Sequence, residues 1–473
     1  MTDLSSPQDD ILSWPAFFRE IHVPTLLLVC LSVWLHAADS LVVATMLPAI
    51  VTEIGGAELV GWSVALYEIG SIVAGAASAL MVMRRGLRWP MVAAALIFAT
   101  GCVMSALSPT MPLMLTGRII QGFGGGGLVA MGLVAVSLLF PPRYTARAIA
   151  AVSALWGLSA FMGPLIGGVF VEFSTWRMGF LFFAVKAVLL ALWLWRAAPE
   201  KGQAEASATD VFPTARLALL FFAVVAIAYA GVRVELWRTT GFVALGLLAL
   251  ALFLIRDSRA GPTRLLPAAP FDPRHPAGAT LLMMFMIAMS TVALTAFGPL
   301  LITAIHGFSA LSIGYLIACS SIGWTIMAIL VSGAPERQDP YWITFGLSLA
   351  ILSIPGFYFA IPHGNWVTIA TCAFADGGGL GIAWAFVLRR TNALVPESEV
   401  QRVSAALPTV QRLGYAIGAA YIGIVANAAG FFDMGTVTEA QSVTRAVFLA
   451  SLIPAVLALP GLWGLVRPQT RST

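Results

Sequence analysis

The sequence predicts an all-α polytopic membrane protein, and two observations support that fold class. The 473 residues are 59% hydrophobic and only 10% charged, with a mean hydropathy of +0.90, whereas soluble globular proteins contain roughly 25% charged residues. The apolar residues also occur in runs long enough to cross the ~30 Å hydrocarbon core of a bilayer, which takes about 20 residues of α-helix. Together these features exclude a water-soluble fold.

Fourteen apolar stretches are candidate spanning helices. The least secure are 214–232 and 240–256, because the second is short and the turn from Arg233 to Arg238 between them is tight. A reading with twelve spanning helices would make these two a re-entrant or interfacial pair. The fourteen stretches are 24–50, 59–83, 89–108, 112–140, 145–171, 177–197, 214–232, 240–256, 277–305, 309–333, 340–361, 366–388, 403–429 and 443–466.

Two polar segments, 198–213 and the proline-rich 257–276, divide these stretches into six, two and six. Transporters built from two six-helix halves bind their substrate between the halves, near the middle of the bilayer. We expect seven parts: a cytoplasmic N-terminal segment (1–23), a six-helix bundle (24–197), a linker (198–213), an extra helix pair (214–256), a second linker (257–276), a second six-helix bundle (277–466) and a cytoplasmic tail (467–473).

The positions of the basic residues predict the orientation. With an even number of spans, the loops on the side of the termini receive most of the arginines and lysines, and the opposite loops receive only Arg177, Arg233, Arg238 and Arg445. Cytoplasmic loops carry the excess of positive charge, so both termini should face the cytoplasm, in a bacterial inner membrane. The first apolar run follows a polar stretch and should remain in the protein as helix 1.

Several classes of function are disfavoured by what the sequence lacks. It contains no Ser-His-Asp spacing, no HExxH and no cofactor or metal fingerprint, so we expect neither an enzyme nor a bound cofactor or metal. The arginines are scattered singly between apolar runs, so the formal charge of +4 does not indicate nucleic-acid binding. The expected partners are a small-molecule substrate, protons and the lipid bilayer, with the protein acting as a monomer.

Charged side chains inside predicted spans are candidate functional residues, because each costs several kcal/mol at mid-membrane. Asp39 lies near the middle of the first span; it is either a structural ion-pair partner for Arg118 or a proton site. Glu68 lies at similar depth in the second span and is a buried, protonatable carboxyl, a cation-binding acid or a residue whose side chain reaches the interface. We predict that Asp39, Glu68 and Arg118 take part in proton coupling.

A second group of residues is expected to line a substrate cavity. Lys186 needs an acid or water near it and is a candidate counter-ion for Glu68 or Asp376. Asp376 precedes a glycine cluster and either serves transport or satisfies loosened backbone groups. Arg412 also lies in a span, with no role evident from the sequence. The predicted cavity residues are His36, Tyr67, Trp156, Lys186 and Asp376.

Two glycine-containing motifs carry a family resemblance. The run RIIQGFGGGG, from Arg118 to Gly127, resembles the span-4 motif of the major facilitator superfamily, and GPLIGG resembles its span-5 antiporter motif. In that superfamily the second motif is associated with exporters, where it kinks the helix and seals the site during exchange. The matching residues, besides Arg118, are Gln121, Gly122 and Gly124 in the first motif and Gly163, Pro164, Gly167 and Gly168 in the second.

The resemblance extends over nearly the whole chain to the fourteen-helix drug:proton antiporters. The segment DSLVVATMLP, residues 39–48, is similar to the span-1 signature of that family. The loop after the second span departs from the family pattern, because Met83 stands where the family has an acid. In the family that acid helps to latch one conformation, so either the latch is weaker here or another group serves. The residues of this loop that match the family pattern are Arg84, Arg85, Gly86 and Arg88.

The resemblance implies a major facilitator fold, with two six-helix bundles plus two extra central helices. It further implies proton-coupled antiport that exports small amphipathic or drug-like molecules by alternating access, driven by the proton gradient. The alternatives are a lipid or lipid-like metabolite exporter of the same fold and, from another class, a membrane-embedded sensor or enzyme.

Overall fold

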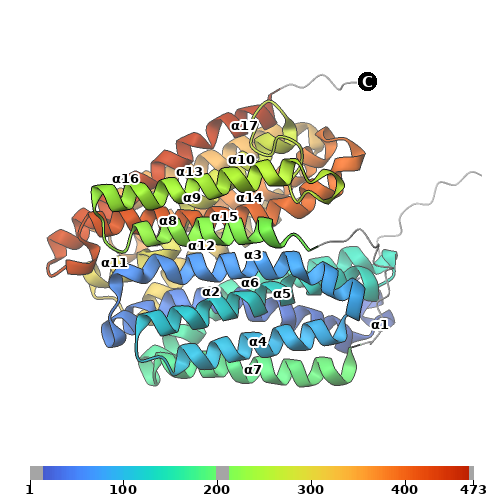
Figure 1. Ribbon diagram of the computed structural model, residues 1–473, viewed down its shortest axis with the longest axis horizontal. Helices are drawn as coiled ribbons and strands as arrows, with labels where there is room; N and C mark the ends of the chain where they lie inside the picture. Colours follow the sequence, from blue (N-terminus) through green and yellow to red (C-terminus); the bar gives the residue numbers. More distant parts are fainter. Residues whose placement is uncertain (1–13, 199–211, 468–473) are drawn as a thin grey trace, which may run out of the picture.

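The computed structural model describes residues 14–198 and 212–467, and within these ranges the regular secondary structure is helical throughout. Most of the predicted N-terminal segment and nearly all of the linker 198–213 and of the tail 467–473 lie outside the described residues. Figure 1 shows the helices running side by side, with the short α1 and the C-terminal helix α17 at the same end of the molecule. We name this the termini end and the opposite one the far end.

The N-terminal bundle contains six long helices that alternate in direction, as predicted for 24–197 (Figure 1). They are preceded by α1 (Trp14–Glu20). The bundle helices are α2 (Val23–Ile54), α3 (Val60–Arg85), α4 (Arg88–Ala106), α5 (Met111–Leu139), α6 (Pro142–Phe173) and α7 (Trp176–Ala197), with a short 3-10 helix, Ala57–Leu59, between α2 and α3.

The C-terminal bundle has the same plan, except that two of its predicted spans are each divided into two helices. The breaks fall where Pro299 and Pro460 begin a new helix, because proline lacks the N–H that would continue the preceding one. The helices are α10 (Pro276–Ala296), α11 (Gly298–His306), α12 (Ala310–Val331), α13 (Asp339–His363), α14 (Trp366–Leu394), α15 (Glu397–Ala428), α16 (Val437–Leu457) and α17 (Leu459–Val466); 3-10 turns occupy Gly261–Thr263, Glu336–Gln338 and Phe431–Asp433.

The extra helix pair consists of α8 (Thr214–Ala230) and α9 (Leu236–Ser258), packed against each other. Helix α8 also contacts α3 of one bundle and α15 of the other, so the pair lies where the two bundles meet (Figure 1). A buried ion pair at the termini end joins the two helices: Arg216 Nη1 donates to Asp257 Oδ1 over 2.6 Å. The same Asp257 carboxylate accepts the backbone N–H groups of Leu265 and Leu266, which attaches the second linker to α9.

Twelve helical segments of the described chain are long and apolar enough to cross a membrane. Two predicted spans fall outside this set. Helix α8 has only 17 residues, and α15, although it has 32 residues, is not apolar enough. The sequence indicated that 240–256 is short for a span, and this was wrong, because α9 extends over 23 residues. The count of fourteen stays a prediction.

Glycine permits the closest helix contacts in both bundles. At Gly122 in α5, a methyl group would collide with the backbone carbonyl of Tyr67 in α3. At Gly377 in α14, it would collide with the backbone carbonyl of Ser320 in α12. Small residues at such crossings let two backbones approach closely, which lipid-exposed bundles need because the bilayer gives apolar helices no hydrophobic reason to associate.

Candidate functional site

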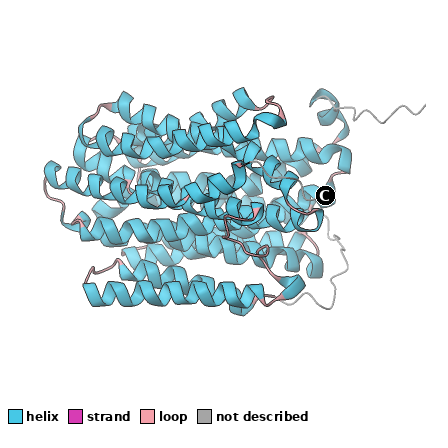
Figure 2. Ribbon diagram, turned by 90° about the horizontal axis from the view of Figure 1, so that it is seen from above, coloured by secondary structure: helices cyan, strands magenta, loops and turns pink. Residues whose placement is uncertain are grey.

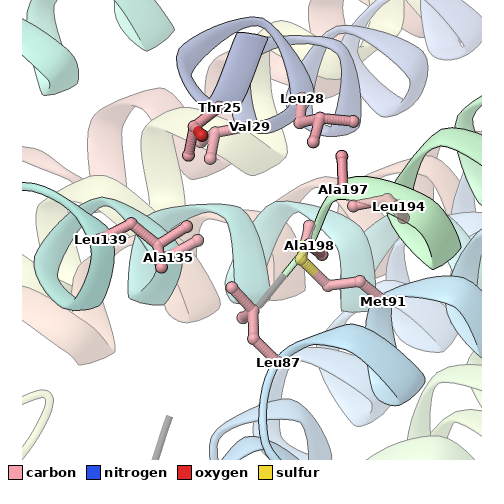
Figure 3. Close-up of a pocket in the computed structure, with 10 residues that line it drawn as sticks. All are labelled: Thr25, Leu28, Val29, Leu87, Met91, Ala135, Leu139, Leu194, Ala197 and Ala198. Carbon is pink, nitrogen blue, oxygen red and sulfur yellow. The ribbon is translucent and has the colours of Figure 1, made fainter. Parts of the chain in front are cut away.

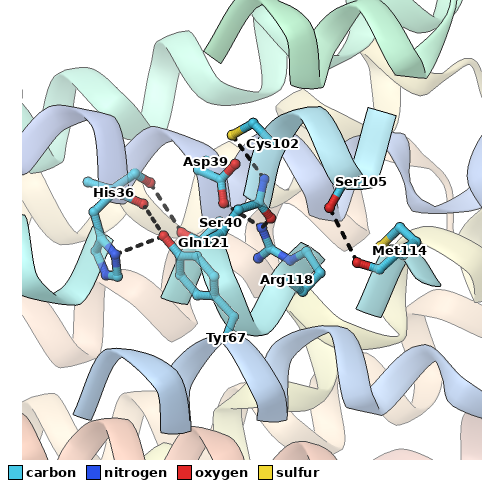
Figure 4. Close-up of polar contacts among 10 residues, drawn as sticks. His36, Asp39, Ser40, Tyr67, Cys102, Ser105, Met114, Arg118 and Gln121 are labelled. Carbon is cyan, nitrogen blue, oxygen red and sulfur yellow. Dashed lines mark hydrogen bonds and ion pairs between the residues drawn. The ribbon is translucent and has the colours of Figure 1, made fainter. Parts of the chain in front are cut away.

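A buried ion pair lies at the centre of the N-terminal bundle. Arg118 of α5 donates through Nη1 to Asp39 Oδ2 of α2 over 2.5 Å, and both residues are at most 2% exposed (Figure 4). The same nitrogen contacts Gln121 Oε1 at 2.8 Å, and Gln121 donates to the sulfur of Cys102 at 3.0 Å. The sequence named this pairing as one reading of Asp39, and the pair is present.

The pair is only partly satisfied by hydrogen bonds. Within the described residues, Asp39 Oδ1 and Arg118 Nε are buried and have no hydrogen-bond partner. The guanidinium also lies over the ring of Tyr67, with 4.1 Å between the Arg118 Cζ and the ring centroid. Attraction between the two charges is strong at this depth but is offset by the cost of removing both from water, so a change in either charge strongly affects the local energy.

His36 lies one helical turn before Asp39 and stacks on Tyr67. The ring centroids are 5.0 Å apart, and the Tyr67 hydroxyl lies 2.8 Å from His36 Nδ1 (Figure 4). Trp156 of α6 presents its edge to the same imidazole at 6.2 Å between centroids. Three predicted cavity residues, His36, Tyr67 and Trp156, therefore come together beside the ion pair, and Trp156 is 44% exposed.

Arg412 of α15 reaches across from the C-terminal bundle to this cluster. Its Nη1 lies 2.7 Å from His36 Nε2, 2.6 Å from the Ser71 hydroxyl and 3.4 Å from Glu68 Oε2. Glu68, for which the sequence suggested Lys186 as counter-ion, is instead paired with Arg412. Sequence reasoning noted only the depth of Arg412; a charged residue at mid-span was the one available signal of its role.

The other two predicted cavity residues lie elsewhere. Lys186 of α7 places its ammonium over the rings of Trp34 and Phe182, at 4.1 and 4.3 Å from their centroids. Helix α7 packs on α4, α2 and α6 of its own bundle, so Lys186 pairs with neither Glu68 nor Asp376. Aromatic faces are adequate partners for the ammonium group of a partly buried lysine.

Asp376 is buried within the C-terminal bundle. Its two carboxyl oxygens accept hydrogen bonds from Ser320 of α12, at 3.1 Å, and from Ser353 of α13, at 3.4 Å. The side chain therefore faces the seam of α12, α13 and α14, where its residue is 5% exposed. Helix α14 continues through the glycine cluster without interruption, and the hydrogen-bond partners of Asp376 among the described residues are side-chain hydroxyls. The second reading, that it satisfies loosened backbone groups, therefore does not describe these contacts, and a role in transport stays a prediction.

The GPLIGG segment of α6 lies against two different partners. Methyl groups at Gly163 and Gly167 would approach α2 within the same bundle, at 2.8 Å from Leu41 Cβ and 2.9 Å from the Val42 carbonyl oxygen. Gly168 instead faces the other bundle, where a methyl group would come within 2.7 Å of Leu311 Cα in α12. The segment thus forms part of the contact between the bundles.

Pro164 completes that contact, because its ring lies against Gly314 of α12. Nearby, Glu172 accepts a hydrogen bond from the backbone N–H of Leu311 at 3.1 Å. These contacts lie in the half of the bundles towards the far end. In the span-4 motif, Gly122 faces α3, and Gly124 faces Ala94 and Phe98 of α4, so that motif binds three helices of one bundle together.

The basic loop after the second span lies at the termini end. Gly86 adopts a φ of +74°, a left-handed conformation that ends α3 and that glycine adopts without strain. Arg88 Nε donates to the carbonyl oxygen of Ala198 over 2.5 Å, which ties the start of α4 to the end of α7. Arg84 and Arg85 are exposed at the last turn of α3.

A small hollow near this loop is separate from the cluster around Asp39. Figure 3 shows it between α2, α4, α5 and α7, at the termini end of the N-terminal bundle. Its lining is almost wholly apolar and contains no ionisable side chain. It therefore offers packing space and no chemistry that could couple to a proton.

Comparison with known proteins gives the family. The family model described as "Major Facilitator Superfamily" matches residues 29–337 and 280–473. The chain belongs to the major facilitator superfamily. The superfamily plan of two bundles accounts for the position of the Asp39 cluster, beside the surface where the halves meet.

Similar proteins of this superfamily include curated efflux transporters. A probable multidrug-efflux transporter of Mycobacterium tuberculosis is 27% identical over 413 residues, covering 84% of this chain and 86% of that protein. The multidrug efflux pump SdrM of Staphylococcus aureus is 24% identical over 413 residues, covering 84% and 88%. Family and relatives are transporters, which supports efflux transport and disfavours an enzyme.

Solved structures confirm the major facilitator fold. A bacterial homologue of the human lysosomal transporter Spinster, in an inward-facing conformation, matches with a TM-score of 0.65 at 15% identity, covering 96% of this chain and 97% of that one. The nucleoside transporter NupG matches with a TM-score of 0.67 at 13% identity, covering 93% and 99%. At these identities the likeness concerns the fold alone.

Proposed function

We propose that this transporter exports small amphipathic molecules in exchange for protons, and that Asp39 is the proton-binding residue. The observation that carries the proposal is the state of the Asp39 carboxylate. One oxygen is bonded to Arg118, and the other is buried without a hydrogen-bond partner among the described residues. A proton on that oxygen neutralises Asp39 and leaves the buried guanidinium of Arg118 without its counter-charge, so protonation changes the energy of the cluster strongly.

The exchange follows from alternating access of the two bundles. Asp39 is sealed from solvent in this conformation, with 1% of its surface exposed, so proton uptake and release require the bundles to move. Protons enter from outside, neutralise Asp39 and weaken the binding of the substrate, which leaves. The contact of Pro164 and Gly168 with α12 is the surface on which one bundle moves against the other.

The names of the curated relatives support export as the direction and drug-like molecules as the substrate class. The aromatic side chains beside the ion pair suit a flat amphipathic ligand, because Trp156 is half exposed next to His36 and Tyr67. Rings of this kind stack on planar or cationic groups.

The test uses purified protein in proteoliposomes with ethidium as the probe and an imposed pH gradient. Asp39→Asn keeps the shape of the side chain but cannot exchange a proton, so we expect pH-driven ethidium accumulation to stop while ethidium binding persists. Asp433→Asn, in a far-end loop, is the matched control and should transport normally. If Asp39→Asn transports fully while Glu68→Gln does not, the coupling role belongs to Glu68 and the assignment of Asp39 is wrong.

We propose further that the protein is a monomer in a bacterial inner membrane, with both termini in the cytoplasm. The positions of the basic loops support this orientation. Arg233 is exposed in the turn between α8 and α9 at the far end, so a cysteine placed there should react with an impermeant thiol reagent added from outside. Labelling from the cytoplasmic side alone would contradict both the orientation and the crossing of α8 and α9.

A further inference from the structure

The side chain of Arg412 crosses from one bundle to the other at mid-depth. Nη1 of Arg412, on α15, lies within 2.7 Å of two acceptors in the N-terminal bundle, His36 Nε2 on α2 and the Ser71 hydroxyl on α3. The Glu68 carboxylate adds an ionic contact at 3.4 Å. An arginine is always a donor, so the contact with His36 requires that Nε2 carry no hydrogen.

The remaining hydrogen bonds of His36 fix the tautomer. The Tyr67 hydroxyl has one hydrogen, and it donates that hydrogen to the backbone carbonyl of His36 at 3.1 Å. The same hydroxyl must then accept from Nδ1, 2.8 Å away. A neutral imidazole carries one hydrogen, here on Nδ1, and leaves Nε2 as the acceptor for Arg412. All three hydrogen bonds are satisfied only by neutral His36.

A second proton on His36 would be placed on Nε2, the atom that Arg412 occupies. The hydrogen bond would be lost, and two positive groups would face each other in a site from which water is largely excluded. The imidazole has little room to turn away. It is stacked on Tyr67, and a methyl group on Gly125 of α5 would already be only 2.7 Å from Nδ1. Arg412 is therefore the group that must move.

The charged side chains around His36 come from four helices and include both anions and cations. The anions are Glu68 on α3 and Asp39 on α2 itself, the latter already paired with Arg118. The cations are Arg118 on α5 and Arg412 on α15. Tyr67 on α3 and Trp156 on α6 face the ring as neutral groups. Glu68 pairs with Arg412 at 3.4 Å, and a proton on His36 adds a positive charge beside Arg412.

We propose that Arg412 is a proton-sensitive latch: it holds the two bundles together while His36 is neutral and lets go when His36 binds a proton. This role is distinct from proton coupling at Asp39, and it rests on the proposed function in one respect, that the bundles move against each other during transport. Arg412 acts as a positioning residue, and His36 is the sensor.

The test measures the separation of the bundles as a function of pH. Spin labels are placed on exposed residues at the far end, Phe173 on α6 and Val367 on α14, in a full-length background with the four native cysteines replaced. Distances are recorded by electron double resonance between pH 8 and pH 5. In the parent protein we expect the population with a longer distance to rise several-fold as the pH falls.

Two variants and one control decide the outcome. His36→Gln can still accept a hydrogen bond from Arg412 through its amide oxygen but cannot be protonated. The distance between the two spin labels should therefore stay short at both pH 8 and pH 5. Arg412→Gln removes the latch, so the longer distance should already be populated at pH 8. His306→Gln is the matched control, because His306 contacts a backbone carbonyl within the C-terminal bundle; it should respond to pH as the parent does.

The latch is overturned if His36→Gln retains the pH response of the parent. Should His36→Gln fail to fold, short distances in Arg412→Gln at pH 8 would overturn it equally. Ethidium transport in the same samples separates this proposal from the proposed function. If the distances shift with pH in a His36-dependent way but no pH-driven transport is seen, the latch is retained and antiport is rejected. If Asp39-dependent transport is normal but the distances do not shift, the latch is rejected and antiport is retained.

Discussion

The two bundles each bury one carboxyl near mid-membrane, but they satisfy it in different ways. In the N-terminal bundle, Asp39 is paired with the cation Arg118. In the C-terminal bundle, Asp376 accepts hydrogen bonds from Ser320 and Ser353, and no cationic side chain of the described chain pairs with it. A buried ion pair is costly to break from either side, whereas hydroxyl donors leave no charge behind when the acid is replaced. The first arrangement suits a site that responds to charge, and the second suits a structural contact.

The largest expected effect comes from removing the cationic partner of the buried Asp39 carboxylate. Arg118→Met should destabilise the protein by about 3–5 kcal/mol, because it leaves a buried carboxylate without its partner. The double variant Asp39→Asn/Arg118→Met should lose less, since no charge is stranded. Thermal unfolding in detergent measures both. Arg177→Met, which removes a partly exposed pair with Glu53, should cost about 0–1 kcal/mol. Equal losses in Arg118→Met and Arg177→Met would refute the importance of the buried pair.

The second prediction concerns the close glycine contacts that occur inside each of the two bundles. Gly122→Ala and Gly377→Ala each introduce a methyl group against a backbone carbonyl of the facing helix, so each should lower stability by about 1–3 kcal/mol. Gly241→Ala in α9 is the matched control, because nothing lies within 4 Å of the added group. Its stability should be unchanged or slightly higher. If the control loses as much as the other two, close packing is not the cause.

A third prediction separates contacts within a bundle from contacts between bundles. Gly168→Ala adds a methyl group 2.7 Å from Leu311 Cα in the opposite bundle. Because the two bundles can shift apart, we expect a loss in stability below 1 kcal/mol, the usual range for tolerated substitutions, with ethidium transport reduced at least tenfold. Gly157→Ala, whose methyl group would meet the side chain of Thr325 at 3.1 Å and no backbone atom of another helix within 4 Å, should transport more than Gly168→Ala. Full transport by Gly168→Ala would show that the contact does not change during the cycle.

The smallest effect is expected for Asp376. The substitution Asp376→Asn preserves the shape and one acceptor for the two serine hydroxyls, so the change in stability should be about 1 kcal/mol or less. Transport by this variant should exceed transport by Asp39→Asn under the same pH gradient. If instead Asp376→Asn abolishes pH-driven transport, the C-terminal bundle carries a coupling acid of its own, and the contrast between the bundles is lost.

The sequence by itself determined the class of protein and the two bundles, and it offered a pair with Arg118 as one of two readings of Asp39. Hydropathy is summed along a local segment, so the existence of the spans can be predicted without knowing how they pack. The reading of Asp39 as a partner of Arg118 was available because few charged side chains lie inside the predicted spans, so each of them has few candidate partners. The prediction of where helices begin and end was less accurate. The breaks at Pro299 and Pro460, which divide two predicted spans into two helices each, depend on local backbone geometry.

The tertiary structure alone decided which of the remaining charges meet. Arg412 reaches His36, which is 376 positions away in the chain, while Lys186, equally near mid-span, points at aromatic rings on its own bundle. The depth of a charge in the membrane can be estimated from its place in a span. The direction in which it points depends on the rotation of each helix about its axis, and that rotation is set by packing against neighbouring helices, which no single segment of sequence encodes.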